Sequence, residues 1–211
     1  MKVCEIFTSI QGESSYAGLP CTFIRLTGCN LRCSYCDTVY AYEEGTELTE
    51  DEIINKVKAA GTNTIEITGG EPLLQGGVLH LIKRLLDEGY MVLVETNGSQ
   101  DIKGIDKRAV VILDIKTPCS KMSEKMRSSN LTYLKPADEL KFVITDRRDY
   151  DWSKNFIIEN GLLGKCKILF SPAFGNIDPA DLSTWIISDR LYVRLNLQLH
   201  KYIYSPDTRG V

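Results

Sequence analysis

The sequence is poor in several features that define common classes of protein. It has only 2 histidines, neither near its clustered cysteines, so a mixed cysteine and histidine metal site has few possible ligands. Its formal net charge is −3, from 25 basic and 28 acidic side chains, which disfavours direct binding of nucleic acid. No apolar run approaches the roughly 18 residues that cross a membrane, and the N-terminal MKVCEIFTSI lacks the layout of a signal peptide. We therefore expect a cytoplasmic protein with no membrane and no nucleic-acid partner.

Cysteine, in contrast, is not scarce. The chain has 7 cysteines, and in a reducing compartment such a number points to metal binding or catalysis more than to disulfides. Cys4, Cys21 and Cys166 lie in apolar, strand-like runs and are expected to act as small buried hydrophobes. At 211 residues the chain is shorter than the length at which one core usually splits, so residues 1–211 are expected to form a single domain.

The hydrophobic pattern alternates between strands and helices. Helical patterns cover 49–61, which opens on a Thr49 to Glu52 capping box, and 78–89, which closes on Gly89, while weaker ones cover about 148–160 and 179–187. The segment 119–138 is predicted to be a long loop with a short helical turn. Runs of apolar and β-branched residues predict strands at 3–7, 21–27, 63–68, 90–95, 110–115, 140–145, 166–170 and 191–197.

This alternation predicts an α/β fold with a parallel sheet, whose ligands gather at the carboxyl ends of the strands. The helices are too few for the eight units of a closed barrel. We therefore expect an incomplete, open barrel of the partial TIM type, with about six parallel strands.

Three cysteines follow one predicted strand at close spacing. Cys29, Cys33 and Cys36 form a CxxxCxxC motif directly after FIRLTG. A structural zinc site needs four ligands; His80 falls off the apolar stripe of its helix, whereas His200 remains a possible fourth ligand. A four-iron cluster normally takes one thiolate per iron, so three thiolates would leave one iron open to a small molecule. The motif favours the iron–sulfur centre, and zinc remains the alternative.

Polar residues also follow or line other predicted strands. TIEITGGEP, 64–72, ends a strand in two glycines, which allow a ligand close to the backbone, although a simple turn would look the same. Asp114 and Lys116 are spaced to share one strand face, and so are Glu139 with Lys141 and Gln198 with His200. Each pair is expected either to line a site or to form a structural pair.

The cysteine spacing, with Tyr35 just before the last cysteine, resembles the signature of the radical S-adenosylmethionine (radical SAM) superfamily. This resemblance implies a modified radical SAM core in which Cys29, Cys33 and Cys36 hold a 4Fe-4S cluster and SAM chelates the open iron. It also implies that an electron from a reductant such as flavodoxin or ferredoxin cleaves SAM to a 5′-deoxyadenosyl radical. The cofactor would perform the difficult chemistry, and the protein would supply position and exclusion of water.

A narrower resemblance covers nearly the whole chain. IFTSIQGESSYAGLPCTFIRLTGCNLRCSYCDT, and then ITGGEP, ETNGS, LDIKTP, ELKFVI, LQLHK and RGV, resemble the 7-carboxy-7-deazaguanine synthase family, except at Ser14 and Leu199. This implies a magnesium-dependent, homodimeric carbon–nitrogen lyase of queuosine and 7-deazapurine biosynthesis. Such a lyase converts 6-carboxy-5,6,7,8-tetrahydropterin to 7-carboxy-7-deazaguanine with loss of ammonia, by radical abstraction of hydrogen from the pterin and ring contraction.

The residues themselves suggest some roles. Arg25 can offer a planar fork to a carboxylate, and Gln11 and Glu13 offer donors and acceptors for a pterin edge, unless QGE is only a polar turn. By resemblance, Thr38 would bind magnesium, and Lys116 and His200 would act in catalysis. SAM contacts would come from Tyr35, Asp37, Gly69, Gly70, Glu71, Thr117, Pro118 and Cys119, and substrate contacts from Ile10, Gln11, Gly12, Glu13, Arg25, Thr68 and Val211.

Two other functions share part of this pattern. A glycyl-radical-activating enzyme has the same fold and cysteine spacing but spends SAM on a protein partner, and the QGE stretch with Arg25 favours the pterin over that partner. A zinc-stabilised binding module would instead contain zinc and no acid-labile sulfide.

Overall fold

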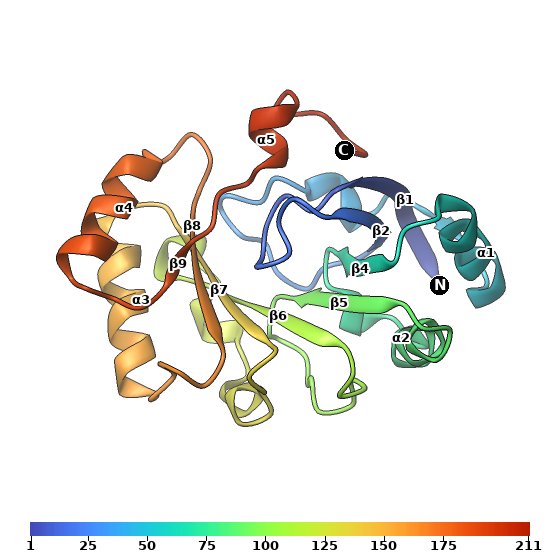
Figure 1. Cartoon of the computed structure of the whole chain (residues 1–211), viewed down its shortest axis with the longest axis horizontal. Coiled ribbons are helices and arrows are strands. Elements are labelled where there is room, and N and C mark those ends of the chain that lie inside the picture. Colours follow the sequence, from blue (N-terminus) through green and yellow to red (C-terminus); the bar gives the residue numbers. More distant parts are fainter.

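The computed structural model describes residues 1–211 and contains a nine-stranded sheet in the order β3-β1-β2-β4-β5-β6-β7-β8-β9 (Figure 1). Every neighbouring pair from β2 to β9 is parallel, whereas β1 pairs antiparallel with β2 and β3. The predicted open, mainly parallel α/β sheet is confirmed. Its strands are β1 (Lys2–Ile10), β2 (Pro20–Leu26), β3 (Thr46–Glu47), β4 (Thr64–Gly69), β5 (Met91–Thr96), β6 (Val110–Ile115), β7 (Glu139–Ile144), β8 (Lys167–Pro172) and β9 (Arg194–Leu195).

The four predicted helices are present, and their ends follow the local signals. Thr49 and Glu52 form the capping box of the first helix, and Gly89, just after the second, has φ 90°. No helix is both long enough and apolar enough to span a bilayer. The helices are α1 (Glu50–Ala60), α2 (Val78–Asp87), α3 (Arg147–Glu159), α4 (Pro179–Ser188) and the unpredicted α5 (His200–Ile203).

The predicted loop at 119–138 is more structured than expected. Three short 3₁₀ turns lie in or at the edge of this segment, at Pro118–Ser120, Ser123–Lys125 and Ser128–Thr132, where the sequence predicted one helical turn. Two other short 3₁₀ turns, Val39–Tyr42 and Pro72–Leu74, follow the cysteine motif and the GGEP stretch.

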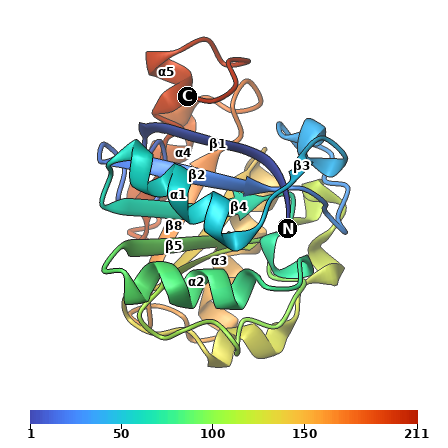
Figure 2. The same cartoon turned by 90° about the vertical axis from the view of Figure 1, so that its right-hand side faces the viewer.

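Helices α1 to α4 lie on the outer face of the curved sheet, and the inner face carries many of the polar groups (Figures 1 and 2). Helices α1 and α2 flank one half of the sheet, and α3 and α4 flank the other (Figures 1 and 2). Along β4, Ile65 and Ile67 are fully buried in the same apolar cluster as Ile53 and Leu81. Because side chains alternate along a strand, Glu66 and Thr68 point to the opposite, concave face.

The loop between β1 and β2, residues 11–19, closes one end of this concave face (Figure 1). The Ser15 backbone N–H donates to both carboxylate oxygens of Glu139 at 3.1 and 3.2 Å, at the beginning of β7. Tyr16 packs against the small apolar cluster of Leu93, Val110 and Ile112. The loop is therefore a fixed floor beneath the concave face.

Ser14 is one of the two positions at which this chain differs from the family pattern, which has glycine there. Its φ is 64°, in the left-handed region where glycine is favoured, and its hydroxyl accepts a hydrogen bond from the Tyr16 N–H at 3.1 Å. A glycine at this position would adopt the same backbone without strain. The loop thus keeps its shape although serine stands where the pattern has glycine.

Candidate active site

A cavity of about 300 Å³ lies on the concave face, between the cysteine loop, the floor loop and the C-terminal segment. It collects most of the side chains that the sequence singled out, and these come from segments far apart in the chain. Glu71, Thr117, Pro118 and Cys119 are absent from its lining. The predicted residues that line it are Ile10, Gln11, Gly12, Glu13, Arg25, Cys29, Cys33, Tyr35, Cys36, Asp37, Thr38, Thr68, Gly69, Gly70, Lys116, His200 and Val211.

The three cysteines converge on the cavity from the loop that follows β2. All three are free and partly exposed. The Cys29 sulfur accepts from the Leu31 N–H at 3.4 Å and from the Asn97 amide at 3.7 Å, contacts that suit a thiolate bound to metal. Burial raises the pKa of the Cys29 and Cys33 thiols, so metal binding has to displace their protons. This donor set fits a cluster held by three thiolates.

The cysteine loop is tied to neighbouring strand ends. The Ser34 hydroxyl donates to the Cys119 carbonyl at 2.6 Å, and the Glu71 N–H donates to the Gly28 carbonyl at 2.7 Å. At Gly70, an added Cβ would lie 2.3 Å from the Gly28 carbonyl oxygen and 2.7 Å from Cys29 Cβ. The GGEP turn therefore packs backbone to backbone against the cysteine loop, which requires glycine at this point.

The Glu71 side chain is bonded within the protein, at the border of the cavity. Its carboxylate is fully buried and accepts from the Thr96 hydroxyl at 2.8 Å and from the backbone N–H groups of Asn97 and Leu73 at 2.7 and 3.0 Å. These bonds join the loops after β4 and β5. The Glu71 side chain thus positions the loops that border the cavity.

Tyr35, Asp114 and Lys116 lie together beside the cysteines. The Lys116 ammonium contacts Asp114 at 2.7 Å; burial opposes its charge, but the combined effect of Asp114, Tyr35 and Cys33 raises the pKa of Lys116. The Tyr35 hydroxyl and one Asp114 oxygen are buried without a hydrogen-bond partner. Unpaired polar atoms at a cavity wall are costly, and they fit a site whose ligand supplies the missing partners.

The cavity floor is a charged network. Lys141 contacts Glu95 at 2.7 Å and also Glu13, whose other carboxylate oxygen accepts from the Gln198 amide at 2.9 Å. Burial opposes charge on both groups, yet their attraction raises the pKa of Lys141 and lowers the pKa of Glu13, so both are ionised. The sequence indicated that Lys141 and Gln198 lie on polar faces of predicted strands. It did not indicate that both contact Glu13, which is distant from them in the chain.

Arg25 presents free donors to the cavity. Its Nε donates to Glu5 at 2.7 Å, and the Tyr40 hydroxyl donates to the same Glu5 oxygen at 2.9 Å, which fixes the guanidinium plane. Its two terminal nitrogens make no hydrogen bond to the protein. A guanidinium held by Nε with its other donors free is suited to bind an anionic group.

The C-terminal segment crosses the mouth of the cavity. The Leu199 N–H donates to the Gly12 carbonyl at 2.8 Å, and the His200 ring lies so close to Gly12 that a Cβ there would be 2.1 Å from Nδ1. Lys201 pairs with Asp37 at 2.6 Å on the cysteine loop. Burial lowers the pKa of His200, so its imidazole is neutral near pH 7. Leu199 differs from the family pattern, but it contacts Gly12 through its backbone N–H, so this contact does not depend on the leucine side chain.

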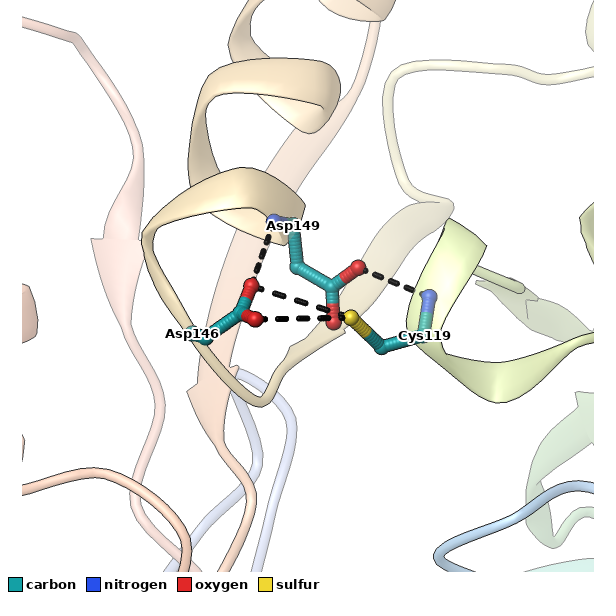
Figure 3. A group of neighbouring side chains, drawn as sticks. All are labelled: Cys119, Asp146 and Asp149. Atoms are coloured by element: carbon teal, nitrogen blue, oxygen red, sulfur yellow. Dashed lines mark hydrogen bonds between the residues drawn. The ribbon is translucent and has the colours of Figure 1, made fainter.

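A further group of possible metal ligands, Cys119, Asp146 and Asp149, lies outside the cavity (Figure 3). Asp149 accepts from the Cys119 N–H at 3.0 Å and from the Thr145 hydroxyl at 2.7 Å, while Asp146 caps α3 through the N–H groups of Arg148 and Asp149. These are the contacts of a helix cap. They fix the backbone of Cys119, which in turn accepts from Ser34 of the cysteine loop.

An open, mainly parallel α/β sheet with three cysteines at the mouth of its cavity is typical of radical SAM enzymes. The model of the radical SAM superfamily matches residues 23–133. The chain belongs to this superfamily, which implies a 4Fe-4S cluster and SAM as cofactors. It is 48% identical to 7-carboxy-7-deazaguanine synthase of Chlorobaculum tepidum and 45% identical to that of Koribacter versatilis, over 100% of this chain and 97% and 100% of those proteins. Within the superfamily, the chain therefore belongs to the 7-carboxy-7-deazaguanine synthase family.

The structural comparison agrees at the level of the fold. The crystal structure of QueE from Escherichia coli matches with a TM-score of 0.77 and 23% identity, over 94% of each chain. At this identity the match shows a shared architecture, and the site is argued from the residues of this chain.

Proposed function

We propose that this protein is a radical SAM lyase that converts 6-carboxy-5,6,7,8-tetrahydropterin to 7-carboxy-7-deazaguanine with loss of ammonia, in queuosine and 7-deazapurine biosynthesis. The observation that carries the proposal is that one cavity holds both the three-cysteine loop and an arginine with free donors. A small acidic substrate bound there would lie next to the cofactor. The names of the full-length relatives support the same reaction.

The cofactor end of the cavity is formed by the cysteine loop and the GGEP turn. Cys29, Cys33 and Cys36 would hold the cluster, and bound cluster and SAM would supply the 5′-deoxyadenosyl radical that takes hydrogen from the pterin. Gly69 and Gly70 leave their backbone open to SAM, and Tyr35 and Asp37 lie on the same wall. Four of the predicted SAM contacts do not line the cavity: Glu71, Thr117, Pro118 and Cys119. They remain predictions, and SAM would have to extend past the cavity wall to reach them.

The substrate end has complementary charge and polarity. Arg25 would bind the pterin carboxylate, and Gln11 and Glu13, with the backbone of Ile10 and Gly12, would face the aminopyrimidinone edge. Thr68 lies beside Arg25 on the neighbouring strand, and Val211 brings the C-terminal carboxylate to the same cavity.

Arg25 provides a direct test of substrate orientation. In Arg25→Met the carboxylate loses its charged donors, so KM for the pterin should rise by about 10- to 100-fold, the range for hydrogen bonds between charged groups. SAM binding, measured by equilibrium dialysis, should change little. Arg108→Met is the matched control, because that guanidinium lies at the surface outside the cavity and pairs with Asp87 and Asp106 at 2.7 Å. An unchanged KM in Arg25→Met would contradict this role.

Two cavity residues are placed for proton movement and charge. Neutral His200 could accept or donate a proton near pH 7, and Lys116, held charged by Asp114, could stabilise negative charge that develops on the substrate. By the family resemblance, Thr38 would be a magnesium ligand, and its hydroxyl, which donates to the Asp37 carboxylate at 2.9 Å, is a hard oxygen ligand of the kind that magnesium prefers. Bound magnesium would supply positive charge beside the substrate.

The setting of the enzyme follows from the same resemblance. We propose that flavodoxin or ferredoxin reduces the cluster, that the enzyme is a homodimer, and that it works in the cytoplasm as a single domain over residues 1–211. The seven unpaired cysteines suit a reducing compartment.

Anaerobic turnover tests the proposal. Iron- and sulfide-reconstituted protein, given SAM, dithionite, magnesium and the carboxytetrahydropterin, should form the deazaguanine, detected by its ultraviolet absorption, without stoichiometric loss of SAM. Stoichiometric consumption of SAM with radical transfer to a protein would instead indicate a glycyl-radical-activating enzyme. Protein that stays colourless after reconstitution and contains zinc without acid-labile sulfide would overturn the proposal.

A further inference from the structure

Glu66 is a buried acid on the cavity floor to which the sequence assigned no role. It points inward from the middle of β4, is 3% exposed and lines the cavity. The Gln11 amide nitrogen donates a hydrogen bond to Glu66 Oε2, and the Gln11 amide oxygen accepts from the Glu13 N–H at 3.0 Å. The Gln11 carboxamide is thus held at both ends, by β4 on one side and by its own turn on the other.

This pair of contacts has one stable arrangement. If the carboxamide rotated, its NH₂ group would face the Glu13 N–H, a contact between two donors. The Glu13 N–H therefore sets the orientation of the carboxamide, and Glu66 accepts from the amide nitrogen that this orientation turns toward β4. We propose that Glu66 is a positioning residue for substrate recognition, which acts through Gln11 to fix the Gln11–Glu13 turn against the substrate.

The charges around Glu66 determine its own state. Glu95 on β5, Glu13 on the floor loop, Lys141 on β7 and Cys21 and Arg25 on β2 all face it. The nearest ammonium, on Lys141, is already in contact with Glu13 and Glu95. Burial, followed by the repulsion of Glu95, raises the pKa of Glu66 well above its usual value and so favours its protonated form.

Protonation of Glu66 determines what it can offer to a ligand. When Glu66 is protonated and Oε2 accepts from Gln11, Oε1, which makes no hydrogen bond to the protein, can donate to a ligand acceptor in the cavity. As the pH rises through its raised pKa, Glu66 ionises beside Glu13 and Glu95. The added negative charge then disturbs the floor, so substrate binding should weaken on the alkaline side.

The inference rests on the proposed function, and variants of the reconstituted enzyme test it. Glu66→Gln keeps a neutral acceptor for Gln11 and should leave KM within about threefold of wild type, whereas Glu66→Leu leaves the buried Gln11 amide unpaired and should raise KM by about tenfold or more with little change in kcat. Glu66→Gln should also lose the rise of KM at alkaline pH. Asp138→Asn is the matched control, a buried acid just before β7 that accepts from the Val111 N–H at 2.8 Å outside the cavity, and it should leave KM unchanged.

The KM values of the two Glu66 variants can overturn the proposal. Equal damage from Glu66→Gln and Glu66→Leu, or an unchanged KM in Glu66→Leu, would overturn the positioning role. If Glu66→Leu does not fold, Glu66→Met takes its place, because its unbranched side chain also offers Gln11 no oxygen acceptor, and an unchanged KM in that variant would also overturn the inference. Failure of the proposed function would appear separately, as wild-type enzyme that does not turn over the pterin.

Discussion

Replacing any one of Cys29, Cys33 or Cys36 by alanine is expected to lower deazaguanine formation by more than about 10⁴-fold, because the reaction depends entirely on cofactor chemistry. Each iron of the cluster normally needs its own thiolate, and this chain supplies only three at the site, so the loss of one leaves no substitute. The effect should appear first in assembly. Iron and acid-labile sulfide, measured after anaerobic reconstitution, should fall with the visible absorption of the cluster.

Cys166→Ala is the matched control for these variants. Cys166 is a free, partly buried thiol just before β8, outside the cavity, and burial raises its pKa to about 11. It is therefore a neutral side chain that takes no part in cluster binding, and its variant should keep wild-type iron content and turnover. Normal product formation by a Cys29, Cys33 or Cys36 variant would contradict the proposed role of the motif.

The parts of the fold that were predictable are those that nearby residues determine. The Thr49 capping box, the Gly89 helix end and the apolar runs of β4 to β8 all have signals within a few residues, and the structure contains each element. Helix α5, with four residues and no side-chain cap, and the two-residue strand β3 carry no such signal. These short elements exist because tertiary contacts hold them, such as the Leu199 bond to Gly12.

In the candidate site, too, local sequence signals identified some residues, whereas other contacts exist only in the folded chain. The cysteine spacing and the polar strand ends marked residues that the cavity does gather, such as Arg25 and His200. The inward position of Glu66 was readable from the alternation of TIEITG, but its partner Gln11 is 55 residues away, and only the folded β1–β2 loop brings the two together. Likewise, nothing local indicates that the side chain of Glu71 bonds to Thr96.

Gly70→Ala is expected to lower turnover by more than about 100-fold, because small misplacements around a reacting centre have effects of that size. The φ of Gly70 is not in the left-handed region, so alanine meets no backbone strain there and only the added methyl matters. That methyl would meet the Gly28 carbonyl oxygen at 2.3 Å and Cys29 Cβ at 2.7 Å. Backbone atoms cannot rotate away, so the GGEP turn and the cysteine loop must separate.

The separation of the GGEP turn from the cysteine loop should also be detected by measurements that do not require turnover. Overpacking of this kind lowers the free energy of unfolding by about 1–3 kcal/mol, measurable by denaturant titration, and SAM binding to the reconstituted protein should weaken along with it. Gly76→Ala adds the same methyl six residues further along, at an exposed position with no atom within 4 Å and no left-handed φ, and it should match wild type in both measurements. If Gly70→Ala also matched wild type, close packing of the two loops would not be what positions the cofactor end of the site.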